Sequence, residues 1–96
     1  SNENNLFYSI SKAGLEVSTK SFNRRCAQNN VLINNVRPGP TLTNFLIKTS
    51  KNLEKRKELI PAKRFCKIEE ISELLFYLID KNTFITNESI SIAGGE

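Results

Sequence analysis

The chain has 96 residues, enough for one domain at most, and its 39% hydrophobic and 25% charged content is that of globular rather than disordered proteins. Much of the net charge of +4 comes from a basic run between Lys48 and Lys57. Glu54 interrupts this run and Glu58 follows it, so we expect a solvated helix face and no nucleic-acid partner. No apolar run approaches the roughly 20 residues that span a bilayer, and the polar start lacks the plan of a signal peptide, so we expect a cytoplasmic protein with no membrane partner.

Residues Leu6–Gln28 predict a long helix, which Asn29-Asn30 ends because Asn tolerates the left-handed conformation common after helices. Its apolar and small positions recur at helical spacing around a wide arc, so we expect the helix to pack on two sides. Val31–Val36 is a short β-branched run, typical of a strand buried on both faces of a parallel sheet. Pro38-Gly39-Pro40 then ends regular structure, because two prolines remove backbone donors and Gly permits unusual dihedral angles.

After this break, residues 43–60 predict one or two short helices over a cleft. Ile68–Ile79 is the clearest helix, since its apolar residues follow helical spacing and two Glu lie in its first turn, where the helix dipole favours negative charge. Ser89–Ile92 is a final short strand. The alternation of helices and strands predicts an α/β fold with a parallel sheet. Two strands are too few for a stable open sheet, so we expect the chain's sheet partners to be missing.

The chain contains two cysteines, no histidine and no methionine. Without His, Cys26 and Cys66 cannot build a zinc site of the Cys/His kind, and we expect no metal and two reduced, partly buried thiols. Because a natural translation product starts with Met, we expect the start of this chain to be processed, engineered or excised. The absent Met and the short sheet together predict a fragment.

Tyr8 and Lys12 are four residues apart, so the predicted helix places them on one face, one turn apart. A phenol is a poor acid or base at neutral pH, but a nearby ammonium stabilises the phenolate. The pair is therefore a candidate proton donor for reducing a carbonyl, or a proton acceptor for oxidising an alcohol. From the spacing alone, a surface Tyr packed on a Lys stem explains the pair equally well.

Several short motifs follow one another along the chain. They are Tyr8-Ser9-Ile10-Ser11-Lys12 with Ala13-Gly14, then Asn34-Asn35-Val36-Arg37-Pro38-Gly39, Pro61-Ala62-Lys63-Arg64-Phe65, Phe84-Ile85-Thr86-Asn87 and Ile92-Ala93-Gly94-Gly95. Their joint order and spacing resemble the C-terminal portion of the classical short-chain dehydrogenase/reductase family. The resemblance implies the C-terminal part of a doubly wound, Rossmann-type parallel sheet, in the order helix, strand, lid, helix, strand. Residues 1–96 would then be the C-terminal fragment of a single dehydrogenase/reductase domain.

The resemblance also implies an NAD(P)-dependent oxidoreductase that interconverts a carbonyl and a secondary alcohol by hydride transfer. Tyr8 would be the catalytic acid/base. Lys12 would stabilise the Tyr8 phenolate and form a hydrogen bond with the nicotinamide ribose of NAD or NADP. The partner would be a small-molecule carbonyl or alcohol substrate.

Four residues near the first predicted strand would bind the nicotinamide end of the cofactor. Pro38 and Gly39 would form a wall against the ring, and Thr41 would offer backbone groups to the carboxamide. Thr43 would contact the carboxamide or the pyrophosphate. From the residues alone, Pro38-Gly39 is equally an ordinary turn, and Thr43 is equally the N-cap of the next helix.

Residues 41–60 match the family's variable substrate lid, in which Phe45 and Leu46 are the candidate substrate contacts. Two departures from the family pattern matter. Asn87 stands where Gly is usual, and we expect the left-handed turn to survive because Asn is the commonest substitute there. Arg37 stands where a small residue is usual, and it would reach an anionic group of the substrate or cofactor, or simply the surface.

Other parts of the family's machinery are absent from the sequence. No Gly-x-x-x-Gly-x-Gly or Gly-x-Gly-x-x-Gly occurs, so most of the cofactor site, including the residue that selects NAD or NADP, would lie in a missing N-terminal part. The family's catalytic Ser lies further upstream than the chain extends. We therefore expect the isolated chain to be inactive. The alternative is a non-catalytic fragment that acts as an oligomerising or interaction module, and the resemblance implies a homo-oligomer, either a dimer or a tetramer.

Overall fold

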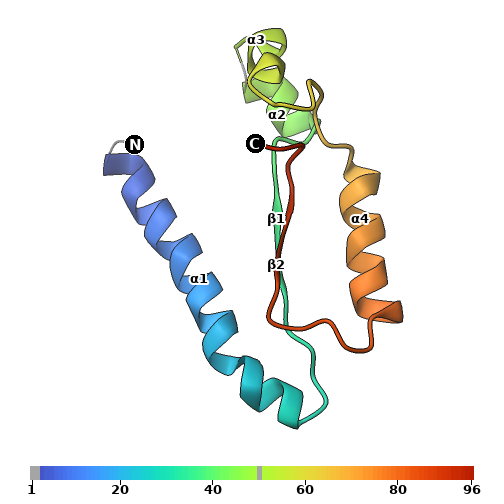
Figure 1. The fold of residues 1–96 in the computed structure, drawn as a ribbon. Helices are drawn as coiled ribbons and strands as arrows, with labels where there is room; N and C mark the ends of the chain where they lie inside the picture. Colours follow the sequence, from blue (N-terminus) through green and yellow to red (C-terminus); the bar gives the residue numbers. More distant parts are fainter. Residues whose placement is uncertain (1–2, 50) are drawn as a thin grey trace. The chain divides into compact units, whose positions relative to one another are not determined.

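The computed structural model of this chain describes residues 3–49 and 51–96. They form two compact units: the first holds the residues up to Asn35 together with Thr83–Ser89, and the second holds Val36–Asn82 and Ile90–Glu96. The elements are α1 (Glu3–Gln28), β1 (Asn35–Pro38), α2 (Asn44–Thr49), α3 (Leu53–Glu58), α4 (Ile68–Phe76), the π-helical turn η1 (Tyr77–Lys81) and β2 (Ser89–Ile92) (Figure 1). Among the described residues, no helix is long and apolar enough to cross a membrane, and no cluster of acidic, His or Cys side chains could hold a metal ion.

The first unit is built around α1, a single helix of 26 residues (Figure 1). Its end is confirmed: Asn30 has a φ of 61°, and the Val31 N–H donates to the Cys26 carbonyl at 2.8 Å, which satisfies a carbonyl of the last turn. Among the described residues of this unit no second helix or sheet covers that arc, so the predicted packing on two sides is not seen within it. Large apolar side chains of α1 are therefore exposed, namely Leu6, Phe7, Ile10, Leu15, Val17 and Phe22.

The strand predicted at Val31–Val36 begins later, at Asn35. The Ile33 backbone is engaged elsewhere: its N–H donates to the Thr86 hydroxyl at 3.0 Å, and its carbonyl accepts from the Asn87 N–H at 2.7 Å. Because these partners are a side chain and a turn, no strand ladder forms there. Burial on both faces is also not observed, since Val31 is 51% exposed.

The turn that contains Asn87 is held by the Asn34 side chain, within the first unit. The Asn34 amide donates to the Ile85 carbonyl at 3.0 Å, and its oxygen accepts from the Glu88 N–H at 3.0 Å. Asn87 has a φ of 64°, so the predicted left-handed conformation is confirmed. Asn34 therefore fixes the turn from which the chain enters β2.

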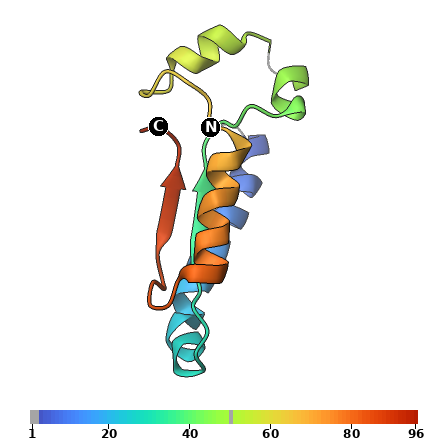
Figure 2. The same ribbon diagram turned by 90° about the vertical axis from the view of Figure 1, so that its right-hand side faces the viewer.

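β1 and β2, which belong to the second unit except for their first residues, pair in a two-stranded sheet and point the same way (Figure 2). This confirms the predicted parallel pairing and the α/β class. The pairing continues just past β1, where the Gly39 N–H donates to the Ile92 carbonyl at 2.8 Å. Pro38, expected to break the strand, is instead its last residue, a place where its missing N–H is tolerated.

The lid segment, residues 41–60, forms two short helices as predicted, α2 and α3, which lie beyond the carboxyl ends of the strands (Figure 2). Asn52 begins α3, because its side-chain oxygen accepts from the Lys55 N–H at 3.0 Å. Ile60 follows α3 and is 1% exposed, the one fully buried apolar side chain among those the structure describes. The packed core of the second unit therefore lies at the end of the lid.

The helix predicted at Ile68–Ile79 is α-helical only to Phe76 and continues as η1. The Asn82 N–H donates to the Tyr77 carbonyl at 2.8 Å, an i→i+5 bond that makes the last turn wider than an α-helical one. The two cysteines, Cys26 in the first unit and Cys66 in the second, are free thiols and half-buried.

Candidate functional site

Tyr8 and Lys12 project from α1, in the first unit. The Lys12 Nζ lies 5.5 Å from the centre of the Tyr8 ring, over its face, close enough for a cation–π interaction. Tyr8 is 64% exposed, so its phenol is accessible to a reacting group. The two side chains thus lie together as the spacing predicts, whereas their catalytic roles stay a prediction.

Gly39, in the second unit, lies in a contact that no other residue could make. A Cβ at this position would lie 2.7 Å from both the Cα and the Cβ of Ala93. This is far inside van der Waals distance, so the end of β1 can approach the segment after β2 only with glycine here. Next to this contact is an open hollow of about 410 Å³, lined by Arg37, Pro38, Gly39, Ser91, Ala93 and Glu96.

Thr41 does not use its own backbone N–H and C=O in its bridge with Cys66. It forms a parallel bridge with Cys66, in which the Pro40 carbonyl accepts from the Cys66 N–H at 2.9 Å and the Leu42 N–H donates to the Cys66 carbonyl at 3.0 Å. In a parallel bridge the N–H and C=O of the central residue point to the other edge. No backbone bond from either group to another described residue is present, so Thr41 offers a donor and an acceptor side by side.

Thr43 is the N-cap of α2, since its hydroxyl accepts from the Leu46 N–H at 3.1 Å. The capping interpretation is thereby confirmed. In the lid segment, Phe45 is 76% exposed and Leu46 is half-buried. The structure therefore gathers the lid candidates and the cofactor candidates after β1 in the second unit, while Tyr8 and Lys12, which is also a cofactor candidate, belong to the first.

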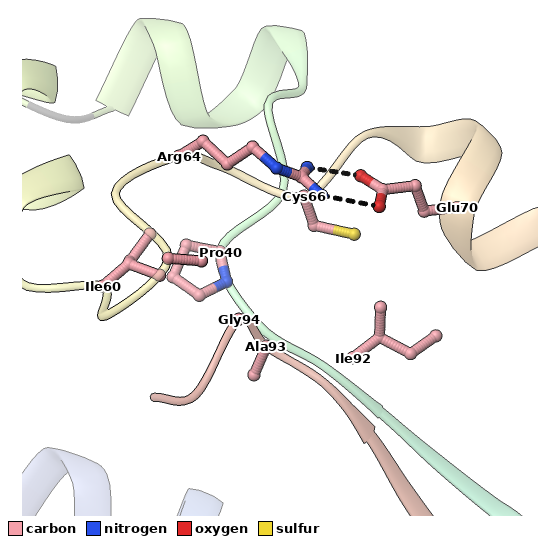
Figure 3. Close-up of a pocket in the computed structure, with 9 residues that line it drawn as sticks. Pro40, Ile60, Arg64, Cys66, Glu70, Ile92, Ala93 and Gly94 are labelled. Atoms are coloured by element: carbon pink, nitrogen blue, oxygen red, sulfur yellow. Dashed lines mark hydrogen bonds and ion pairs between the residues drawn. The ribbon is translucent and has the colours of Figure 1, made fainter.

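Arg64 and Glu70, which were not among the predicted site residues, form a bidentate ion pair in the second unit (Figure 3). The distances are 2.7 Å from Nη1 to Oε1 and 3.0 Å from Nη2 to Oε2. Glu70 also accepts from the Lys67 N–H at 2.9 Å and so caps α4. The guanidinium of Arg64, and then the Lys67 N–H, hold the pKa of Glu70 at about 2, below its ordinary 4.5.

The Arg64–Glu70 pair lines a cavity of about 50 Å³, room for no more than a few water molecules (Figure 3). The other walls are apolar or small, apart from Cys66. They are Pro40, Ile60, Ala62, Cys66, Ile92, Ala93 and Gly94. The cavity is too small for a substrate, so we assign the ion pair a structural role: it joins the loop after the lid to the start of α4.

The whole chain, residues 1–96, matches the family model described as Enoyl-(Acyl carrier protein) reductase. The chain is 39% identical over 90 residues to the 3-oxoacyl-(acyl-carrier-protein) reductase FabG of Aquifex aeolicus, covering 92% of this chain and 36% of that protein. It is 34% identical over 90 residues to the acetoacetyl-CoA reductase of Acinetobacter sp., with the same coverage. The solved short-chain dehydrogenase/reductase of Serratia marcescens superimposes with a TM-score of 0.84 at 33% identity, covering 95% of this chain and 38% of that one. The chain belongs to the short-chain dehydrogenase/reductase family.

This dehydrogenase/reductase chain thus spans little more than a third of the length of the relatives it matches. The likeness to the Serratia structure confirms the predicted C-terminal part of a Rossmann-type sheet. It also gives a reason for the exposed apolar arc of α1, because a doubly wound sheet covers its helices with strands that two strands alone do not provide.

The Arg64–Glu70 pair has only a weak signal in the sequence. A Glu three residues after the residue that precedes a helix is typical of a capping box, and Glu70 holds that place relative to Lys67. No neighbouring residue indicates that Arg64, six residues before Glu70, is its partner. The loop that brings the two side chains together is held by the Thr41–Cys66 bridge. The Arg64–Glu70 pair could therefore be identified only from the folded structure.

We expect Glu70→Gln to weaken the fold at neutral pH but not in strong acid. The folded pKa of Glu70, about 2, lies below the ordinary 4.5, so the pair stabilises the fold fully above pH 4.5 and loses this effect as pH falls toward 2. Urea unfolding midpoints should therefore differ between the two proteins at pH 7 and converge on acidification. Glu69→Gln, one position earlier on α4, is the matched control, and equal midpoints for all three proteins at pH 7 would contradict the assignment.

Proposed function

We propose that this chain forms the C-terminal part of an NAD(P)-dependent oxidoreductase that interconverts a carbonyl and a secondary alcohol. The observation that carries the proposal is the Tyr8–Lys12 pair, with the ammonium 5.5 Å from the phenol ring, in a chain of an oxidoreductase family. We further propose that the protein is a cytoplasmic homo-oligomer, a dimer or a tetramer.

The bound nicotinamide would supply or accept the hydride. In the reductive direction, Tyr8 would donate its phenolic proton to the carbonyl oxygen as that oxygen gains negative charge. In the oxidative direction, the Tyr8 phenolate would take the proton from the alcohol. Lys12, held one helical turn away, would stabilise the phenolate in both directions and would hydrogen-bond the ribose of the cofactor.

The residues after β1 fit the nicotinamide end of such a cofactor. A carboxamide has an NH₂ group that donates and a carbonyl that accepts, and Thr41 presents an N–H and a C=O that its bridge with Cys66 does not use. Gly39 has no side chain that could obstruct the nicotinamide ring, and Pro38 lies beside it. Thr43 would contact the carboxamide or the pyrophosphate from the N-terminus of α2. The 96 residues contain no glycine-rich phosphate loop, so the choice between NAD and NADP would be made outside them.

A 3-oxoacyl thioester is the substrate class we favour. The Aquifex and Acinetobacter relatives are named for the reduction of a 3-oxoacyl carrier protein and of acetoacetyl-CoA. Phe45 and Leu46 supply an apolar contact of the kind an acyl chain needs, since Phe45 is largely exposed on α2. Sugar and steroid ketones are the classes to compare with it.

The test is an assay of the protein that carries this chain with the remainder of the family's domain. We expect acetoacetyl-CoA to be reduced with loss of the absorbance of NADPH or NADH, and glucose to be a poor substrate in the oxidative direction. The 96-residue chain alone should give no turnover. Absence of turnover by the longer protein with all carbonyl and alcohol classes would refute the proposed activity, whereas turnover by the short chain would refute its inactivity.

A non-catalytic, oligomerising module is the second candidate, and the exposed apolar side chains of α1 favour it. Phe7, Ile10 and Val17 together form a surface that another copy could cover. Sizing chromatography of the 96-residue chain and titration with NADH separate the candidates. A stable multimer that does not bind NADH supports the module, and a monomer eliminates it.

A further inference from the structure

The last turn of α3 is tied to the segment that follows β2 by a second bidentate ion pair. Arg56 Nη1 lies 2.8 Å from Glu96 Oε2, and Nη2 lies 2.5 Å from Oε1. Both side chains are about one-third exposed, 33% and 35%, so the pair is partly shielded from water. Paired planar groups of this kind are stronger and more directional than single-contact ion pairs.

The same two segments are also in contact at Gly94, where the packing leaves no room for a side chain. The Ala62 N–H donates to the Gly94 carbonyl at 2.9 Å, and a Cβ on Gly94 would lie 2.9 Å from the Ala62 Cβ and 3.2 Å from the Ile60 Cγ2. Gly94 also has a φ of 61°, which disfavours other residues. Residues 56–62, the rear of the lid and the two residues after it, are thus fixed by a buried side chain, a backbone bond and an ion pair.

Beyond the Thr41–Cys66 bridge, the described residues of α2 lack comparable anchors. α2 buries none of its side chains, and Phe45 and Ile47 are both exposed. The other cations of α3 do not share the anchoring: Lys57 pairs with Glu54 of its own helix at 3.2 Å. Arg56 is therefore the α3 cation that engages the segment after β2.

We propose that the Arg56–Glu96 pair is a latch that holds α3 in the position from which the lid covers the substrate. Both are then positioning residues, an inference that rests on the proposed oxidoreductase function. When the pair breaks, α3 is free to turn about the buried Ile60, and the lid loses its fixed rear end. The chemistry at Tyr8 is unaffected, so the loss appears in substrate binding before it appears in the chemical step.

The latch is closed at neutral pH. The hydrogen bonds from Arg56 hold the pKa of the Glu96 carboxyl below its ordinary value, so the carboxylate stays ionised well into the acid range. Arg37 of β1 lines the same hollow as Glu96 and adds a second positive charge to its surroundings. The contact between Glu96 and Arg56 therefore depends on the negative charge of the carboxylate, which Gln does not carry.

The experiment uses the protein that carries this chain with the rest of the domain, in three variants. They are Glu96→Gln, the charge swap Arg56→Glu with Glu96→Arg, and the control Glu58→Gln, an exposed carboxylate on α3 that leaves the pair intact. The first readout is amide hydrogen exchange of residues 53–62. We expect exchange about two- to five-fold faster in Glu96→Gln, as for a partly exposed ion pair, with recovery in the swap and no change in the control.

The second readout is steady-state kinetics with acetoacetyl-CoA. We expect KM to rise in Glu96→Gln by more than kcat falls, and the swap to restore it. Unchanged exchange in Glu96→Gln would refute the latch, and faster exchange with unchanged KM would refute the positioning role. No turnover of acetoacetyl-CoA by the unaltered protein would instead refute the proposed substrate class, and no turnover of any carbonyl or alcohol class would refute the proposed oxidoreductase and the positioning role with it. The exchange data would still decide whether the latch exists.

Discussion

We expect Tyr8→Phe, in the protein that carries this chain, to lower kcat by about 10²- to 10⁴-fold, the usual contribution of a general acid or base. The substitution removes only the hydroxyl and keeps the ring against which Lys12 packs at 5.5 Å. The helix and the cation–π contact should survive, so the loss reports the proton transfer. The measurement is the rate of NAD(P)H oxidation at saturating carbonyl substrate.

Tyr77→Phe is the matched control for this prediction. It removes the other tyrosine hydroxyl of the chain, which is exposed at the start of η1, and should leave kcat unchanged. Lys12→Met should raise the KM for the cofactor and lower kcat, since it would lose both the ribose contact and the stabilisation of the phenolate. A Tyr8→Phe protein with the kcat of the unaltered protein would eliminate Tyr8 as the acid/base.

Ile60→Ala should lower the free energy of unfolding by about 2–5 kcal/mol, the range for truncating a buried aliphatic side chain. Ile60 is 1% exposed and fills the space beside Gly94 and the Arg64–Glu70 pair. The substitution leaves a cavity, and Gly94 beside it has no side chain that could move in to fill it. Urea unfolding followed by circular dichroism measures the loss.

Leu59→Ala is the control for Ile60→Ala, because Leu59 is adjacent in sequence but 69% exposed. Its effect should stay within about 0.5 kcal/mol, as for most surface substitutions. Ile60→Val should fall between, at about 0.5–1.5 kcal/mol. If Ile60→Ala and Leu59→Ala are equally stable, the core of the second unit does not lie at the end of the lid.

Local sequence was sufficient for the features that depend on neighbouring residues. Helix propensity and the Asn residues that follow correctly predicted the last residue of α1, Gln28. Asn87, which stands where the family usually has Gly, predicted the left-handed turn there. The lid was predicted as one or two short helices, with N-cap of the first as one of two interpretations of Thr43, and the structure has two helices with Thr43 as that N-cap. Backbone dihedral preferences and i,i+3 or i,i+4 contacts act within one turn, so a single stretch of sequence contains them. The family was recognised in the same way, from motif order.

The contacts between distant segments needed the folded chain. The β-branched run at Val31–Val36 forms a strand only from Asn35, because Thr86 and Asn87 engage Ile33 from more than fifty residues away. The Arg56–Glu96 pair, 40 residues apart, has no local signal, since the β1–β2 pairing and the buried Ile60 bring its members together. Such contacts depend on how the chain returns on itself, and residue type restricts this only weakly. The Tyr8–Lys12 pair could therefore be predicted from sequence, whereas the latch could not.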